Sequence, residues 1–387
     1  MPASSSTVFH QNFDASAYIS ARPRYQPVVF DLLRAWHENE GSNKRFDDCL
    51  DVGCGPGILS YPLGTIFKRV VGLDPSPTML AQARSNSVPE ALDLTLPEGH
   101  SVSFVEGSIG PEEKGKLNDL EDASFDFILA GTAIHWVDWK SDPKGEKIWQ
   151  EFSRLLRPGG SIFFIGYCPE VIQHYPLIDA GVRRLIWDED EGLGKYFDFT
   201  SPLAPTYLST GLYIGLPCPA ESYGGWEERD SHLYLFDAEE RLKRMEGQGT
   251  LQETLGGHMV VVPSKEKLKE KAGVPQWIAK PLAADHANDD DDRFARLASF
   301  AKPGERSTTT LRGLAKMYHS ASAWPKYLAD HPEEKEMQKQ GKDLLCRILE
   351  KARQEDAKER NAEPVGWDEP LDVIHPTALF VARKKLE

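Results

Sequence analysis

Three glycines and two aspartates are spaced so that they can hold a charged nucleoside ligand. Gly53, Gly55 and Gly57 follow an apolar segment directly, and glycine lets a chain turn sharply and approach a ligand closely. Asp51 lies two positions before the first glycine, and Asp74 ends the next apolar segment, where a carboxylate can accept both hydroxyls of a ribose. Two carboxylates repel the phosphates of a dinucleotide. We therefore expect a ligand that joins an adenosine to a cationic, zwitterionic group.

The segments that carry these residues alternate between strand-like and helix-like patterns. This alternation predicts parallel βαβ units and a doubly wound α/β sheet. Strands are expected at 49–52, 70–74, 102–105, 125–130 and 161–166, and helices at 58–67, 78–83 and 148–156. Pro62 requires the first of these helices to start late or to kink. Ser76 and Pro77 are typical of an N-cap and a first helical position. Because right-handed crossovers bring the carboxyl ends of parallel strands to one edge, we expect the glycines and both aspartates to share a crevice there.

The βαβ alternation weakens near Pro169, and the rest of the chain predicts a cap over the sheet. Helical patterns occur at Val182–Trp187 and Glu333–Arg360, and an apolar strand is expected at Thr377–Ala382. The strand-like segment Ser231–Phe236 lies between them. The expected architecture is a Rossmann-like, seven-stranded sheet with a large helical cap insertion before the terminal strands. The predicted parts are an N-terminal lid segment (1–40), a nucleoside-binding core (41–168), a cap or substrate insertion (169–368) and a terminal strand returning to the sheet (369–387).

Composition narrows the class of partner. The 387 residues include 45 basic and 60 acidic side chains, a formal net charge of −15, which argues against nucleic acid as the main partner. No apolar run is long enough for a membrane span. The five cysteines are scattered without a paired motif, as in proteins of reducing compartments, so we expect a cytoplasmic location. The acidic run at 288–292 is interpreted as a solvated loop, and no metal is expected.

Several motifs together resemble one enzyme family. Leu50–Gly57, Val70–Asp74 and Leu155–Gly160 look like motifs of class I S-adenosylmethionine-dependent methyltransferases. Phe13–Tyr18, Arg22–Pro23, Tyr25 and Ala133–Asp138 resemble the small-molecule branch typified by trans-aconitate methyltransferases and related fungal enzymes. The resemblance covers about residues 9–170, with a weaker likeness at Leu311–Trp324 and in the last strand. It implies S-adenosylmethionine as the cofactor.

The resemblance also implies roles for individual residues. Asp51 would lie near the amino group of the cofactor, Asp74 would hold the ribose, and Arg22 would suit the carboxylate. Ser108 stands in the adenine-side loop, where many relatives have an acidic residue. Ala130, Gly131 and Thr132 should flank the sulfonium. The full set of expected cofactor-binding residues is Tyr18, Arg22, Asp51, Gly53, Gly55, Gly57, Asp74, Ser108, Ile109, Ala130 and Gly131.

His135 and Trp136 are the candidates for contact with the methyl acceptor. His135 has three open interpretations: a general base, a hydrogen-bond donor to substrate, or a structural histidine beside Trp136. Alignment of the reactants can supply much of the acceleration of a methyl transfer, and a carboxylate acceptor has no proton to lose. A general base is needed only when the acceptor must lose a proton, and His135 is the one candidate for that catalytic role. Trp136 is interpreted as a wall of the substrate pocket.

The predicted function is transfer of a methyl group to an oxygen, carboxylate or hydroxyl, of a small organic metabolite or toxin, as in secondary metabolism. Three alternatives stay open. In the first, the acceptor atom is nitrogen or sulfur instead of oxygen. In the second, the protein is a methyltransferase-like regulator without small-molecule turnover. In the third, it binds the cofactor without transferring the methyl group. The cap is expected to set substrate choice, because specificity usually lies in variable loops over a rigid sheet.

Overall fold

The computed structural model describes fourteen segments of the chain, which fall into two compact units. The described residues are 25–39, 41–85, 89–90, 93–110, 120–139, 141–167, 170–188, 190–196, 216–217, 219–227, 231–236, 259–262, 305–321 and 323–387. The first unit, here called the sheet unit, contains the described residues from 25 to 167, from 216 to 262 and from 376 to 387. The second, the helical unit, contains those from 170 to 196 and from 305 to 375.

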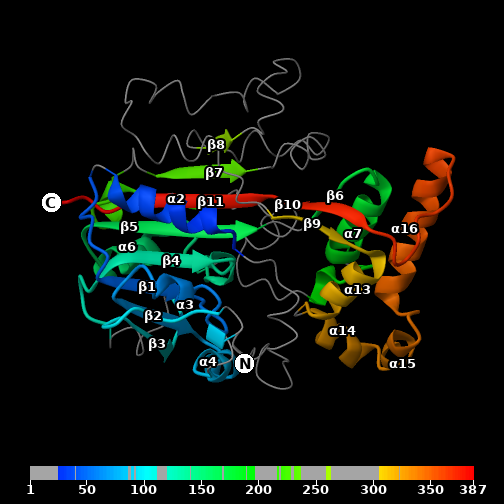
Figure 1. The fold of residues 1–387 in the computed structure, drawn as a ribbon, viewed down its shortest axis with the longest axis horizontal. Coiled ribbons are helices and arrows are strands. Elements are labelled where there is room, and N and C mark those ends of the chain that lie inside the picture. The colour runs from blue at the N-terminus through cyan, green and yellow to red at the C-terminus, as the bar shows by residue number, and fades with distance from the viewer. Residues whose placement is uncertain are drawn as a thin grey trace, which may run out of the picture. The chain divides into compact units, whose positions relative to one another are not determined.

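An eight-stranded sheet in the order β3-β2-β1-β4-β5-β11-β7-β8 forms the centre of the sheet unit (Figure 1). Its strands are β1 (Asp48–Val52), β2 (Arg69–Asp74), β3 (Ser101–Glu106), β4 (Phe125–Gly131), β5 (Leu156–Tyr167), β7 (His232–Phe236), β8 (Met259–Val262) and β11 (Thr377–Arg383). β1 to β5 are parallel, whereas β11 runs antiparallel between β5 and β7. This confirms the predicted doubly wound α/β class. The seven expected strands are present, and β8 adds an eighth beside β7.

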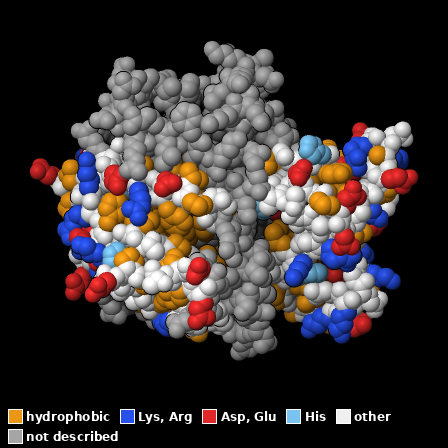
Figure 2. All heavy atoms as spheres, viewed as in Figure 1, with side chains coloured by type: hydrophobic (Ala, Val, Ile, Leu, Met, Phe, Trp, Pro, Cys, Tyr) orange, Lys and Arg blue, Asp and Glu red, His pale blue; other side chains and the backbone are white. Residues whose placement is uncertain are grey.

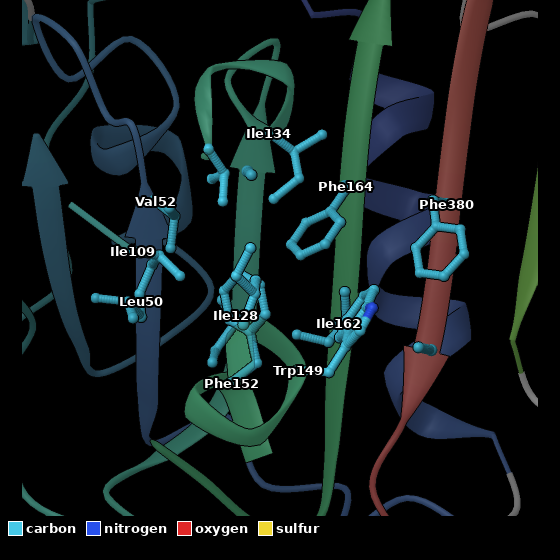
Figure 3. Close-up of a cluster of buried hydrophobic side chains, with 14 of the residues drawn as sticks. Leu50, Val52, Ile109, Ile128, Ile134, Trp149, Phe152, Ile162, Phe164 and Phe380 are labelled. Atoms are coloured by element: carbon cyan, nitrogen blue, oxygen red, sulfur yellow. The ribbon is translucent and has the colours of Figure 1, made fainter. Parts of the chain in front are cut away.

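Apolar side chains on both faces explain why these strands occur as nearly continuous hydrophobic runs. Alternate residues point to opposite faces, so that Leu50 and Ile128 join one buried cluster whereas Cys49 and Phe127 join the other. Figure 3 shows the first cluster, in which the ring of Trp149 lies beside those of Phe164 from β5 and Phe380 from β11. Both faces of the central strands are thus covered by core.

Helices follow the strands at the expected places, with one marked difference. The sheet unit contains α2 (Pro27–Glu38), α3 (Ser60–Leu63), α4 (Pro77–Ala83), η3 (Ile134–Trp136), α6 (Glu146–Leu155) and η5 (Glu221–Tyr223). Ser76 caps α4 by accepting the N–H of Met79 at 3.3 Å, which confirms the predicted N-cap. The helix expected over 58–67 is only the four residues of α3, which begins late, with Pro62 in its first turn, and ends at Leu63.

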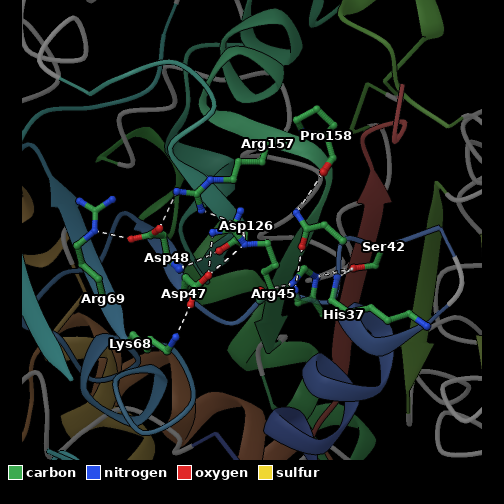
Figure 4. A network of polar contacts seen from close by, with 12 residues as sticks. His37, Ser42, Arg45, Asp47, Asp48, Lys68, Arg69, Asp126, Arg157 and Pro158 are labelled. Atoms are coloured by element: carbon green, nitrogen blue, oxygen red, sulfur yellow. Dashed lines mark hydrogen bonds and ion pairs between the residues drawn. The ribbon is translucent and has the colours of Figure 1, made fainter. Parts of the chain in front are cut away.

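Arginine–carboxylate pairs close the amino edge of the sheet, where the parallel strands begin (Figure 4). Arg157 reaches Asp48 at 2.7 Å and the fully buried Asp126 at 2.9 Å. Arg69 also pairs with Asp48, at 2.5 Å. His37 lies beside this network, and burial lowers its pKa to about 4. The carboxylates at this edge are therefore matched by positive charge.

The helical unit packs its helices against a small three-stranded sheet, β6-β10-β9. Its elements are β6 (Val171–Ile172), α7 (Pro176–Trp187), η4 (Gly194–Tyr196), β9 (Glu305–Thr309), α13 (Leu311–His319), α14 (Ala323–Asp330), α15 (Glu334–Lys339), α16 (Leu344–Arg360) and β10 (Leu371–His375). The single helix expected over 333–360 is two helices. Gly341 has φ +65°, and Asp343 begins α16 by accepting the N–H of Cys346. A left-handed glycine ends one helix, and a new N-cap starts the next.

The structure divides the predicted insertion of residues 169–368 differently from the sequence analysis. β7 pairs with β11 inside the main sheet, so this part of the expected cap belongs to the sheet unit. β10 instead pairs with β6 and β9 in the helical unit, although it was grouped with the terminal strand. The reason is that strand pairing joins segments far apart in sequence, which composition along the chain does not reveal.

The described surface mixes charges of both signs. On the face shown in Figure 2, Lys and Arg side chains are interspersed with Asp and Glu side chains over the described residues of each unit. Among the described helices, none has the length and apolar character required to cross a bilayer.

Candidate cofactor site

The three glycines form a tight loop directly after β1. All have positive φ, +67° at Gly53, +54° at Gly55 and +87° at Gly57, a region that residues with a Cβ rarely adopt. The N–H groups of Gly53 and Cys54 both donate to the carbonyl of Leu73, at 2.7 and 3.0 Å. The loop is thereby fixed to the end of β2. A Cβ at Gly55 would meet no heavy atom within 4 Å, so the loop is open at this glycine.

Asp74, the last residue of β2, is tied to the glycine loop. One carboxylate oxygen accepts the N–H of Gly55 and the other accepts the N–H of Ser76, both at 2.9 Å. The residue is 8% exposed. Burial raises the pKa of Asp74, and the two backbone hydrogen bonds oppose that rise. Each oxygen has a further lone pair, so Asp74 can hold the loop and still accept hydrogen bonds from a ligand.

Asp51 is buried at the carboxyl end of β1, with 1% of its surface exposed. Its Oδ2 accepts a 2.6 Å hydrogen bond from Ser60, the first residue of α3. Burial raises the pKa of Asp51 to about 7; the hydrogen bond from Ser60 opposes this rise, and the negative charge of Asp74 adds to it. Among the described residues, no Lys or Arg side chain pairs with Asp51 or Asp74. The two carboxylates thus create a locally negative environment.

The end of β4 packs against the glycine loop. A Cβ at Gly53 would lie 2.4 Å from the Cβ of Ala133, so the two chain segments touch there. Ala130 is fully buried in the core, and Gly131 leaves room for Leu59, whose Cδ1 would lie 2.1 Å from an added Cβ. Any ligand contact of Ala130 or Gly131 would be made by backbone atoms.

The remaining expected site residues lie in different environments. Ile109 is buried in the core cluster shown in Figure 3, so only its backbone can reach a ligand, whereas Ser108 is partly exposed. His135 is 3% exposed in η3 with its ring centroid 5.0 Å from that of Trp136. Trp136 is 38% exposed, which is high for a large apolar side chain. Of the two acceptor candidates, Trp136 therefore offers the larger free surface.

Two expected cofactor residues, Tyr18 and Arg22, lie outside the described residues. Three residues with aromatic rings in the segment Leu311–Trp324, where the weaker family likeness lies, have partners within the helical unit. Tyr318 donates to Glu170 at 2.8 Å, His319 lies 3.3 Å from the carboxylate of Asp343, and Trp324 donates to Gln338. These contacts give the three side chains a structural role.

Comparison with known proteins identifies the central part of the sheet unit. Residues 50–164 match the family model described as a methyltransferase domain. They contain the glycine loop, both carboxylates and the end of β4. By this likeness, residues 50–164 are called the methyltransferase domain.

Matches to curated proteins cover more residues than the family model does. The chain is 27% identical over 189 residues to CRG1 of Saccharomyces cerevisiae, named a probable S-adenosylmethionine-dependent methyltransferase, covering 49% of this chain and 57% of that protein. It is 32% identical over 140 residues to a malonyl-[acyl-carrier protein] O-methyltransferase of Enterobacter lignolyticus, covering 35% and 47%. A ubiquinone biosynthesis O-methyltransferase of Methylobacterium sp. is 26% identical over 168 residues, covering 43% and 59%. The chain thus spans about half the length of these relatives.

The residues of the methyltransferase domain fit the cofactor of its family, S-adenosylmethionine. Two buried carboxylates that pair with no Lys or Arg of the described segments suit a ligand that carries an ammonium and a sulfonium, because an uncompensated buried charge is costly. The open position at Gly55 admits close approach to the backbone. The fit therefore rests on both the charge and the shape of the loop.

Sequence reasoning missed three contacts that shape the methyltransferase domain. Ser60 donates to Asp51, Ala133 fills the space beside Gly53, and the hydroxyls of Tyr25 and Thr132 meet at 2.8 Å. Tyr25 and Thr132 each stood inside a recognisable motif. Nothing in their spacing of 107 positions signals that they touch.

Proposed function

We propose that this protein transfers a methyl group from S-adenosylmethionine to an oxygen of a small organic molecule. The observation that carries the proposal is the pair of buried carboxylates, Asp51 and Asp74, which flank a glycine loop and pair with no described Lys or Arg. Such a site favours a cationic nucleoside ligand. When bound, S-adenosylmethionine supplies an electrophilic methyl group on a sulfonium.

Each side chain of the site has a distinct proposed task. Asp51 accepts a hydrogen bond from the amino group of the cofactor and must be ionised to pair with its charge. Asp74 accepts hydrogen bonds from the ribose hydroxyls while it also accepts the N–H of Gly55. The loop glycines allow the backbone to approach the ligand. Ser108 and Ile109 line the adenine side, with Ile109 using its backbone. Tyr18 and Arg22 remain sequence-based assignments to the same ligand.

The acceptor side of the site is assigned to η3. Trp136 offers an exposed ring against which an apolar part of the acceptor packs. His135, buried against that ring, orients the acceptor, or takes its proton when the acceptor is a hydroxyl. A carboxylate acceptor needs no such base. We expect His135→Ala to slow turnover more than it weakens cofactor binding; an equal loss of both would assign His135 a structural role.

Oxygen is the proposed acceptor atom because two relatives carry that activity in their names, an O-methyltransferase of ubiquinone biosynthesis and one acting on malonyl-[acyl-carrier protein]. A small-molecule acceptor is also the expectation from the N-terminal and η3 motifs. The cytoplasmic location and the absence of nucleic-acid and membrane partners rest on the sequence alone.

The deciding experiment incubates the purified full chain with isotope-labelled S-adenosylmethionine and a fractionated metabolite extract. Mass spectrometry is expected to detect a labelled product one methyl group heavier than its precursor, and chemical hydrolysis then distinguishes esters from ethers and from nitrogen or sulfur products. The Asp74→Asn variant is the matched control and should form far less product. A chain that binds S-adenosylmethionine but labels nothing in any fraction would instead favour a regulatory or cofactor-binding protein.

A further inference from the structure

Two hydroxyl groups from distant parts of the chain meet at the carboxyl end of β4. The Oη of Tyr25 lies 2.8 Å from the Oγ1 of Thr132. Tyr25 directly precedes Gln26, the N-cap of α2, and its ring centroid lies 5.9 Å from that of Tyr167 at the end of β5. Tyr25 is thereby held beside the ends of two central strands, next to the loop in which the acceptor candidates lie.

Thr132 has a backbone conformation that a β-branched residue disfavours. Its φ is +51°, and a threonine in the left-handed region is a genuine outlier that needs support from its surroundings. Its N–H donates to the carbonyl of Ile165 at 2.7 Å, and its side chain meets Tyr25. The preceding Gly131 makes room for this contact, since a Cβ there would lie 2.9 Å from the Tyr25 hydroxyl.

This strained turn is in direct contact with the glycine loop. Ala133, the next residue, fills the space beside Gly53: a Cβ added to Gly53 would lie only 2.4 Å from the Cβ of Ala133. A change in the backbone of Thr132 moves Ala133 and so the surface on which Gly53 rests. The contacts run in an unbroken series from the Tyr25 hydroxyl through Thr132 and Ala133 to the loop.

We infer that Tyr25 is a positioning residue for the cofactor. Its hydroxyl holds Thr132 in the left-handed conformation and thereby keeps Ala133 seated against Gly53. The inference rests on the proposed function only for the identity of the ligand that the loop binds. Tyr25 acts here through Thr132, without contact with the reacting atoms.

The test removes the Tyr25 hydroxyl in two backgrounds. Glycine adopts a positive φ without strain, so Thr132→Gly needs no help from Tyr25. We expect Tyr25→Phe to weaken binding of S-adenosylmethionine about 3- to 10-fold in the wild-type background, the size of one lost hydrogen bond, and less than about 2-fold in the Thr132→Gly background. Isothermal titration calorimetry measures the binding, and it requires no methyl acceptor.

Hydrogen exchange of the Thr132 amide in the ligand-free full chain gives a second, independent readout. Tyr25→Phe should speed this exchange by a similar factor, because local opening becomes easier. Tyr223→Phe, which removes a hydroxyl from η5, is the matched control and should change neither measurement.

Three outcomes would overturn the inference: no loss of affinity in Tyr25→Phe, an equal loss in both backgrounds, or unchanged exchange at Thr132. Equal losses would mean that the hydroxyl acts on the ligand directly. If the wild-type chain failed to bind S-adenosylmethionine at all, the proposed function would fall, and the exchange measurement would still decide the role of Tyr25.

Discussion

The two edges of the main sheet both bury carboxylates, but they treat the charge in opposite ways. At the amino edge, Asp126 and Asp48 are paired with Arg157 at 2.9 and 2.7 Å. At the carboxyl edge, the donors to Asp51 and Asp74 among the described residues are a hydroxyl and two backbone N–H groups. Burial raises the pKa of both carboxyl-edge residues, that of Asp51 to about 7.

The difference separates a structural use of charge from a binding use. A buried carboxylate with an arginine partner is neutralised inside the protein. A buried carboxylate without an arginine partner either carries an unfavourable charge or stays protonated until a cationic ligand binds beside it. Within the described part of the chain, the carboxylates of the amino edge therefore have cationic partners, whereas those of the carboxyl edge have none and are suited to a positively charged ligand. Substitutions at both edges and a pH series test this distinction.

The largest expected effect is at the amino edge. Arg157→Met leaves Asp126, which is fully buried, without its closest cation. Breaking a buried pair costs about 3 kcal/mol of the free energy of unfolding, which urea denaturation measures. Adding Asp126→Asn should restore part of this loss, because the uncompensated charge is gone. The affinity of folded Arg157→Met for S-adenosylmethionine should be unchanged. Reduced affinity with normal stability would mean that the amino edge serves binding and not structure.

The next effect is at the carboxyl edge and is one of binding. Asp74→Asn keeps a carbonyl that can accept one of the two backbone N–H groups but removes the charge. Hydrogen bonds to a charged group contribute about 1.5–3 kcal/mol, so affinity for S-adenosylmethionine should fall about 10- to 100-fold by calorimetry. Asp47→Asn, at the exposed part of the amino edge, is the matched control and should bind normally. Equal affinities in the two variants would remove Asp74 from the site.

The fold was largely predictable because most strands are buried on both faces and therefore stand out as apolar runs. The Ser76 cap was predictable for a similar reason, since capping depends on a few adjacent residues. The helix predicted over 58–67 starts late, as Pro62 led us to expect, but it is shorter than predicted because it ends at Leu63. The predicted continuous helix over 333–360 was wrong because Gly341 ends α15 and the next helix begins anew.

The site was predictable only in part. The glycines, Asp51 and Asp74 follow from strand ends and motif spacing, because parallel strands bring those ends together. The Arg157–Asp126 pair and the Ser60–Asp51 hydrogen bond depend on how side chains meet after folding. No local pattern encodes such contacts, so the contrast between the two edges emerges only from the structure.

A pH series sharpens the comparison at Asp51. Its pKa of about 7 in the folded chain means that the folded state holds a proton that the unfolded state has lost above about pH 4. Stability of the ligand-free chain should therefore decrease as pH rises from about 4 to 7. Cofactor binding needs the ionised form, so affinity should increase roughly tenfold between pH 5.5 and 7. Calorimetry at matched ionic strength measures this series.

The matched variant for the pH series is Asp51→Asn. It should bind more weakly at neutral pH, and its affinity should change little over the same range, because no carboxyl group remains to titrate at that position. A variant that kept the full pH dependence would assign the titration to a group other than Asp51.

The smallest effect separates the contribution of the Ser60 hydroxyl from that of burial. Ser60 donates to Asp51 at 2.6 Å and so favours the ionised carboxylate. Ser60→Ala should raise the pKa of Asp51 further, move the midpoint of the binding curve to higher pH and weaken binding at pH 7 about 2- to 5-fold. Thr65→Ala, which removes an exposed hydroxyl just after α3, should leave the curve unchanged. In the Asp51→Asn background, Ser60→Ala should not change the pH dependence of binding any further. If it did, Ser60 would act on the glycine loop directly, and burial alone would set the charge of Asp51.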